Sequence, residues 1–97
     1  MSELRFEWDE LKAESNAQKH GVTFNEAQTV FYDANARLRY DSEHSLDEER
    51  HILLGMSSSL RLLVVSHLYQ EDIELIRIIS ARKATKRERQ QYREFYE

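Results

Sequence analysis

The chain has 97 residues, 40% of them hydrophobic and 33% charged, with a formal net charge of -4, so we expect one globular domain over residues 1–97. The absence of cysteine excludes disulfides, thiol nucleophiles and thiolate metal sites, and two glycines without any proline leave no glycine-rich phosphate loop. The longest aliphatic run, Leu62 to Val65, is too short to span a membrane, and the N-terminus has no apolar signal segment, so we expect a cytoplasmic protein without membrane contact.

The N-terminal part of the chain predicts a short strand followed by two helices. Residues 4–8 alternate apolar and charged side chains, which is the pattern of a half-buried strand. Asp9 can then cap a helix that runs to about Lys19. The sequence Thr23-Phe24-Asn25-Glu26 has the form of a capping box, in which the hydroxyl and the carboxylate each satisfy a free helix amide. It predicts a second helix to about Phe31.

The middle of the chain is rich in β-forming residues. Residues 36–40 alternate again and predict an edge strand with one wet face, followed by a polar, acidic loop from Asp41 to Asp47. Three further runs, Arg50 to Ser57, Arg61 to Tyr69 and Ile73 to Arg82, are joined by short turns. Such short connections predict an antiparallel meander. Apolar residues on both faces of the last run indicate a central strand.

A basic helix closes the chain. Thr85-Lys86-Arg87-Glu88 is a second capping box, and Glu88, Tyr92, Phe95 and Tyr96 fall on one side of the helix that it opens. Residues 76–97 carry seven Lys/Arg against three Glu, whereas residues 1–75 carry seven Lys/Arg against fifteen Asp/Glu. This concentration of positive charge predicts a surface for a polyanion or an acidic partner.

The order βααββββα defines the predicted fold class. It is an α+β fold with a mainly antiparallel sheet of four to five strands, two N-terminal helices and a C-terminal helix. We expect the first two helices to cover one face of the sheet.

Two separated groups of residues resemble the motifs of a known family. They are Phe6-Glu7-Trp8-Asp9, Asn16, Lys19-His20-Gly21-Val22, Phe24, Glu26-Ala27, Asp41, Glu49-Arg50, the run from Ile76 to Ala84, Glu88-Arg89 and Tyr92. In this order they resemble the BrnT toxins of bacterial type II toxin-antitoxin pairs. The resemblance implies a RelE-like fold and a metal-independent ribonuclease that arrests translation without a cofactor. It also implies neutralisation by a BrnA-type antitoxin with a ribbon-helix-helix segment, so that DNA is contacted only through the antitoxin.

His20 and Lys19 are the first candidates for a catalytic role. Metal-free RNA cleavage requires a base for the 2′-hydroxyl, cations for the phosphorane and an acid for the leaving oxygen. Histidine titrates near neutrality, so His20 can serve as base or acid. Alternatively, it packs at the helix end against Ala13 and Ala17. Lys19 is either a phosphate contact or a solvated charge favoured by the helix dipole.

Arg77, Ser80 and Arg82 are the candidates in the last strand. Arg77 has apolar neighbours, and an unpaired guanidinium is costly to bury, so it either forms a buried ion pair or faces a cleft that takes a phosphate. The possible partners are Glu7, Asp9, Glu26 and Glu49. Because side chains alternate along a strand, Ser80 and Arg82 lie opposite Arg77 unless the strand bulges or ends first.

The candidates for RNA binding are basic residues in and around the C-terminal helix, with one tyrosine. They are Arg50, Lys83, Lys86, Arg87, Arg89 and Tyr92. For two or three of the basic residues an ordinary solvated helix face is the expected role. Tyr92 either stacks on a base or pins the helix to the sheet.

The histidines do not predict a metal site. His20, His44, His51 and His67, together with Asp41 and Asp47, show no recognised ligand spacing, and no nucleophile elbow for a Ser-His-Asp site is present.

Two functions from different classes follow. The first is a metal-independent endoribonuclease that cleaves mRNA through attack by its own 2′-hydroxyl. The alternative is a non-catalytic binding module whose basic C-terminal helix docks an acidic protein partner or nucleic acid. Cleavage of a labelled RNA with and without EDTA distinguishes them.

Overall fold

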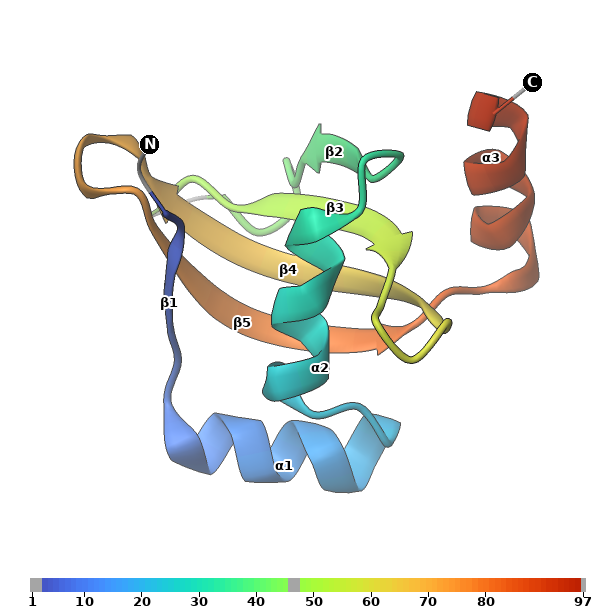
Figure 1. Ribbon diagram of the computed structural model, residues 1–97. Coiled ribbons are helices and arrows are strands. Elements are labelled where there is room, and N and C mark those ends of the chain that lie inside the picture. The colour runs from blue at the N-terminus through green and yellow to red at the C-terminus, as the bar shows by residue number, and fades with distance from the viewer. Residues whose placement is uncertain (1–2, 46–47, 97) are drawn as a thin grey trace.

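The computed structural model describes residues 3–45 and 48–96, without the side chains of 95 and 96, and it shows a five-stranded sheet with three helices around it (Figure 1). The elements are β1 (Arg5–Glu7), α1 (Glu10–His20), α2 (Phe24–Thr29), the 3-10 turn η1 (Val30–Tyr32), β2 (Arg37–Tyr40), β3 (His51–Met56), β4 (Leu62–Gln70), the 3-10 turn η2 (Glu71–Ile73), β5 (Leu75–Lys83) and α3 (Lys86–Tyr96). Within the described ranges, no helix combines the length and apolar character that crossing a bilayer requires.

The predicted α+β class and element order are confirmed. The strand order is β1-β5-β4-β3-β2, and the pairs β2–β3, β3–β4 and β4–β5 are antiparallel, as the short turns predicted. β1 instead pairs in parallel with β5, so the sheet is mixed. The last strand begins at Leu75 rather than Ile73, because residues 71–73 form a 3-10 turn.

The helix starts form largely as their sequences indicate. The Asp9 carboxylate accepts hydrogen bonds from the amides of Leu11 and Lys12, and Thr85 and Glu88 form a reciprocal capping box. Thr23 also accepts a hydrogen bond from the amide of Glu26. The Glu26 carboxylate, however, accepts from Arg61 and Ser57, so it ties α2 to the β3–β4 turn.

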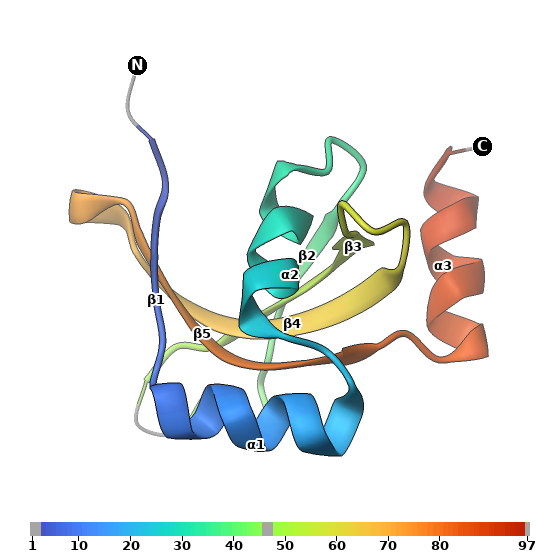
Figure 2. The same ribbon diagram turned by 60° about the horizontal axis from the view of Figure 1, so that its bottom comes forward.

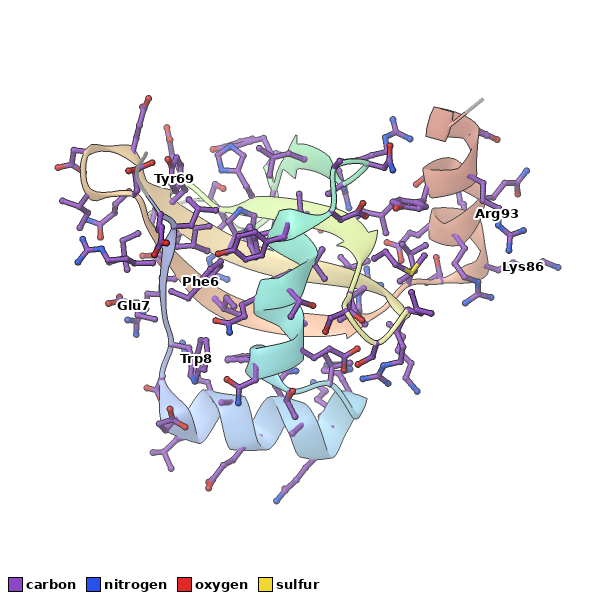
Figure 3. The ribbon with its side chains drawn as sticks, in the orientation of Figure 1. Phe6, Glu7, Trp8, Tyr69, Lys86 and Arg93 are labelled. Carbon is purple, nitrogen blue, oxygen red and sulfur yellow. The ribbon has the colours of Figure 1, made fainter. Side chains whose placement is uncertain are left out.

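One face of the sheet, which we call the closed face, is covered by α2 (Figure 2). Its buried sheet residues are Leu53, Leu63, Val65, Ile76, Ile78 and Ala81. Phe24, Ala27 and Val30 pack onto them from α2 and η1. Phe6 of β1 and Trp8, which directly follows β1, also point inward (Figure 3). The apolar side of α2 and η1 therefore forms part of the hydrophobic core.

The opposite face, which we call the open face, is covered at one end by α3. Tyr92 is 3% exposed, packs with Leu54 and Val64, and donates a hydrogen bond of 2.6 Å from its hydroxyl to Oδ2 of Asp33. The tyrosine therefore anchors α3, and the suggestion that it stacks on a base is wrong because its ring is buried. No described helix covers the remainder of this face.

α1 departs from the expected arrangement. The side-chain amide of Asn16 donates to the carbonyl of Ala81 at 2.8 Å, and its Oδ1 accepts from the Ala81 amide at 3.1 Å. Backbone groups of a strand point along the plane of its sheet, so α1 lies at the edge of β5, beyond the short β1, and not beside α2 on the closed face (Figure 2).

β2 is an edge strand, as predicted. All four of its residues are exposed, including Leu38 at 61% and Tyr40 at 50%. Both faces of β2 are therefore exposed to solvent, whereas the alternation of apolar and charged residues had predicted only one solvent-exposed face.

Candidate active site

A pocket of about 430 Å³ occupies the part of the open face that α3 leaves uncovered. We call it the open-face pocket. Its floor is formed by Ile52, Val64, Ser66 and Ser80, and its sides by His20, Arg39, Tyr40, Asp41, Ser42, Glu43, His44, Arg50 and Arg82; Ala81, whose side chain faces the closed side, also borders the pocket. Four of the predicted site residues, His20, Arg50, Ser80 and Arg82, meet there.

A bulge in β5 decides which side chains reach this face. Ser66 pairs with Ser80, but the next residue of β4, His67, pairs with Ile78, so Ile79 is an extra residue in β5. The alternation therefore shifts by one, and both Ile78 and Ala81 face the closed side. As a result, Arg77, Ser80 and Arg82 share the open face. Strict alternation had placed Ser80 and Arg82 opposite Arg77 unless the strand bulges, and the bulge is present.

Arg77 nevertheless lies outside the pocket. It is paired with Glu7 of the neighbouring β1, and its NH1 is 2.8 Å from Oε2 of that glutamate. The two side chains are 41% and 44% exposed, and Glu7 lies on the outer side of β1 (Figure 3). Of the two alternatives, the ion pair is the one observed, with one of the four acids named from the sequence. The pair is exposed and not buried, because the apolar neighbours Ile76 and Ile78 face the other side of the strand.

Arg82 is held at the pocket by a bidentate ion pair with Glu88. Its NH1 and NH2 lie 2.8 and 3.0 Å from the two carboxylate oxygens of Glu88, which also accepts from the amide of Thr85. The hydrogen bonds from Arg82 lower the pKa of Glu88 to about 2, and those to Glu88 raise the pKa of Arg82. The first turn of α3 thus orients one cation of the pocket.

Two further arginines enter from the opposite side. Arg39 is aligned with Ile52 in the β2–β3 pair, and Arg50 directly precedes β3. Among the described residues, Nε of Arg50 is buried without a hydrogen-bond partner, while its NH2 is 3.5 Å from Oε1 of Glu48. A buried N–H without an acceptor lowers the stability of the folded protein.

Sequence reasoning missed several residues that line the pocket, namely Arg39, Asp41, His44 and Ser66. From the sequence, Arg39 was interpreted only as part of the exposed face of a strand and His44 only as a candidate metal ligand, while Asp41 was considered as a metal ligand and as part of the family resemblance, but not as a site residue. Ser66 did carry a signal, since it is a polar residue within an aliphatic run and is directly opposite Ser80.

The other predicted residues lie outside the pocket. They are Lys19, Lys83, Lys86, Arg87 and Arg89, all of them exposed. Arg89 donates to the carbonyl of Ala84, and Lys86 and Arg93 project from α3 away from the sheet (Figure 3). None of these cations lines the pocket. Asp47, Phe95 and Tyr96 were also singled out from the sequence, and residue 47 and the side chains of residues 95 and 96 lie outside the described part of the chain.

Comparisons of the sequence and of the structure with known proteins point to the same family. The sequence model of a family described as "Ribonuclease toxin, BrnT, of type II toxin-antitoxin system" matches residues 8–88. The crystal structure of the Brucella abortus ribonuclease toxin BrnT is similar, with a TM-score of 0.66 and 23% sequence identity over 87% of this chain and 100% of the other. At that identity the likeness concerns the fold. No curated protein matches the sequence.

Proposed function

Because the chain belongs to the BrnT family of ribonuclease toxins from type II toxin-antitoxin systems, we propose that the open-face pocket is the active site of a metal-independent endoribonuclease that cleaves mRNA and so inhibits translation. The observation that carries this proposal is the convergence of three arginines on one pocket that also contains two histidines, His20 and His44. Arg82 comes from β5, Arg39 from β2 and Arg50 from the segment before β3.

The arginines suit the charge that develops during RNA cleavage. The phosphorane formed by attack of the 2′-oxygen carries more negative charge than the phosphodiester, and fixed cations stabilise it preferentially. Guanidinium groups bind phosphate oxygens through two parallel hydrogen bonds, and Arg39, Arg50 and Arg82 bring three such groups to the pocket.

Two proton-transfer groups suffice to account for every bond and proton in the cleavage reaction. The 2′-hydroxyl loses a proton to a base and its oxygen bonds to phosphorus. The bond from phosphorus to the 5′-oxygen breaks, and that oxygen takes a proton from an acid, leaving a 2′,3′-cyclic phosphate and a 5′-hydroxyl. His20 supplies one of these two proton-transfer groups. Among the described residues, no group of three or more His, Asp or Glu side chains is arranged to hold a metal ion.

The test uses two arginines on the same strand and the same face. The wild-type protein should cleave a labelled single-stranded RNA in the presence of EDTA, and Arg82→Met should cleave it about 100-fold more slowly or worse. Arg77→Met is the matched control and should cleave at the wild-type rate, since Arg77 lies outside the pocket. RNA binding without cleavage by the wild-type protein would favour the binding-module alternative.

The partner implied by the family is an antitoxin. We infer that it is of the BrnA type, with a ribbon-helix-helix DNA-binding segment, and that it neutralises the toxin by covering the basic open face in competition with RNA. Co-expression should then relieve growth arrest, and excess RNA should slow formation of the complex. Growth arrest that persists with both proteins present would contradict this inference.

A further inference from the structure

A histidine-aspartate pair lies on the side of the open-face pocket formed by the loop after β2. Nδ1 of His44 is 3.0 Å from Oδ2 and 3.3 Å from Oδ1 of Asp41. The Asp41 side chain is 10% exposed, whereas that of His44 is 61% exposed. The carboxylate is therefore buried behind an imidazole that a substrate can reach.

This geometry fixes which ring nitrogen carries the proton. An ionised carboxylate only accepts hydrogen bonds, so Nδ1 of His44 must be the donor. In the neutral ring the lone pair then resides on Nε2, on the side of the ring away from Asp41. A histidine held in this tautomer is prepared to accept a proton through Nε2.

The base of the loop is held in place, which keeps the pair in position. The backbone amide of Asp41 donates to the carbonyl of Arg50 at 2.9 Å. The hydroxyl of Ser45 donates to the carbonyl of Asp41 at 2.5 Å and accepts from the amide of Arg50 at 3.0 Å. The same contacts place the pair beside Arg50, a proposed phosphate ligand.

His44 and His20 stand on opposite sides of the pocket. His20 follows Asn16 by one helical turn, and Asn16 is bonded to β5, so His20 borders the β5 side. β3 and β4 separate β5 from β2, which puts the two sides on the order of 14 Å apart between backbones. Side chains that reach inward from both sides leave room for a sugar-phosphate unit between them, and in-line displacement needs its base and acid on opposite sides of the phosphorus.

We propose that His44 is the general base of the ribonuclease, with Asp41 as its positioning residue and His20 as the acid. Nε2 of His44 takes the proton of the 2′-hydroxyl, the 2′-oxygen bonds to phosphorus, the bond to the 5′-oxygen breaks, and His20 protonates that oxygen. The other charged groups lining the same pocket are Arg39, Glu43, Arg50 and Arg82. This assignment rests on the proposed ribonuclease activity.

The first experiment is single-turnover cleavage of a labelled RNA by His44→Gln. The rate should fall at least about 100-fold, the size of a lost proton-transfer group. Binding of the same RNA with 2′-O-methyl groups throughout, which cannot be cleaved, should change less than about twofold, because an exposed neutral ring contributes little to binding. His51→Gln is the matched control, since His51 lies in β3 outside the pocket, and it should cleave normally.

The second experiment tests Asp41 through its effect on the ring. Two-bond ¹⁵N–¹H spectra of the histidine-labelled protein at alkaline pH should show His44 protonated at Nδ1. Asp41→Asn places an amide donor beside that nitrogen and should shift the proton to Nε2, while lowering kcat about tenfold or more at unchanged KM. Asp41→Glu should recover part of the rate.

The outcomes separate the two proposals. If the wild-type protein cleaves RNA and His20→Gln does not, but His44→Gln cleaves normally, only the assignment of His44 is wrong. A wild-type spectrum with the proton on Nε2 also overturns it. If the wild-type protein cleaves no RNA, the ribonuclease proposal fails and this assignment fails with it.

Discussion

The two faces of the sheet use the same strands but differ in what covers them. On the closed face, Leu53, Leu63 and Val65 are each at most 7% exposed beneath α2. On the open face, β3 and β4 present apolar residues beneath α3 at one end and the pocket floor around Ile52 and Ser66 at the other. Strand alternation thus lets one face provide most of the hydrophobic stability while the other presents polar groups to a ligand. Substitutions on the two faces should therefore have different consequences.

The largest effect on stability is expected from the closed face. Phe24 is 2% exposed and meets the ring of Trp8 edge-to-face at 5.9 Å between centroids. Phe24→Ala should lower the free energy of unfolding by about 3–5 kcal/mol, because it removes buried area and leaves a cavity. Ile52→Ala, at the half-buried pocket floor, is the comparison and should cost less than half as much in urea denaturation. Equal costs would show that the faces do not differ as described.

The next effect is a pH dependence that arises on the closed face. His67 is 3% exposed, and burial lowers its pKa from 6.5 to about 4. As the pH falls from 6.5 to 4, the unfolded chain takes up a proton that the folded protein does not, so folded stability should decrease by up to about 3 kcal/mol. His67→Phe should flatten the unfolding free energy in this window. An unchanged slope in the variant would exclude His67 as its cause.

A smaller effect is expected where the open face meets α3. Arg82→Met removes the ion pair of Glu88 and leaves this carboxylate with its hydrogen bonds to Thr85. Because the arginine side chain is 40% exposed, solvent screening should limit the loss of stability to about 1 kcal/mol. Glu88→Gln should cost a similar amount, which thermal melts can measure. A much larger loss for Arg82→Met would mean that its cleavage defect reflects unfolding and not a missing cation.

The smallest effect is expected at Arg77. Its pair with Glu7 is exposed on both sides, so Arg77→Met should change the free energy of unfolding by less than about 0.5 kcal/mol. Glu7→Gln should behave in the same way. A destabilisation of several kcal/mol would assign Arg77 to the packed part of the structure, against the exposure of both side chains.

The sequence predicted what depends on local pattern. The caps at Asp9 and Thr85 are short-range hydrogen bonds between residues a few positions apart, and the period of the apolar residues identified the strands. The partner of Arg77 was narrowed to four acids but not chosen, because its choice depends on which strand lies beside β5.

The site was harder to predict because it depends on register and on loop closure. Arg39 meets Arg82 in one pocket through the packing order of four strands, which no local pattern encodes. Asp41 and His44 are three residues apart in a polar loop, a spacing that indicates a functional pair only once both are seen beside the pocket. The role of Tyr92 could not be chosen from the sequence, because its contacts are distant in the chain: its ring packs with Leu54 and Val64, and its hydroxyl donates to Asp33, 59 positions away.

The extra residue in β5 also has a consequence for comparing this chain with its relatives. Before Ile79 the odd-numbered residues of β5 face the open side, and after it the even-numbered residues do. If a relative lacks the extra residue, an alignment that places the gap elsewhere in β5 would match residues that face opposite sides of the sheet. A relative whose strand is one residue shorter at Ile79 would still present the counterparts of Arg77, Ser80 and Arg82 on the same side. Removal of Ile79 should accordingly be tolerated better than removal of Ala81, which would reverse the orientation of every residue on one side of the gap.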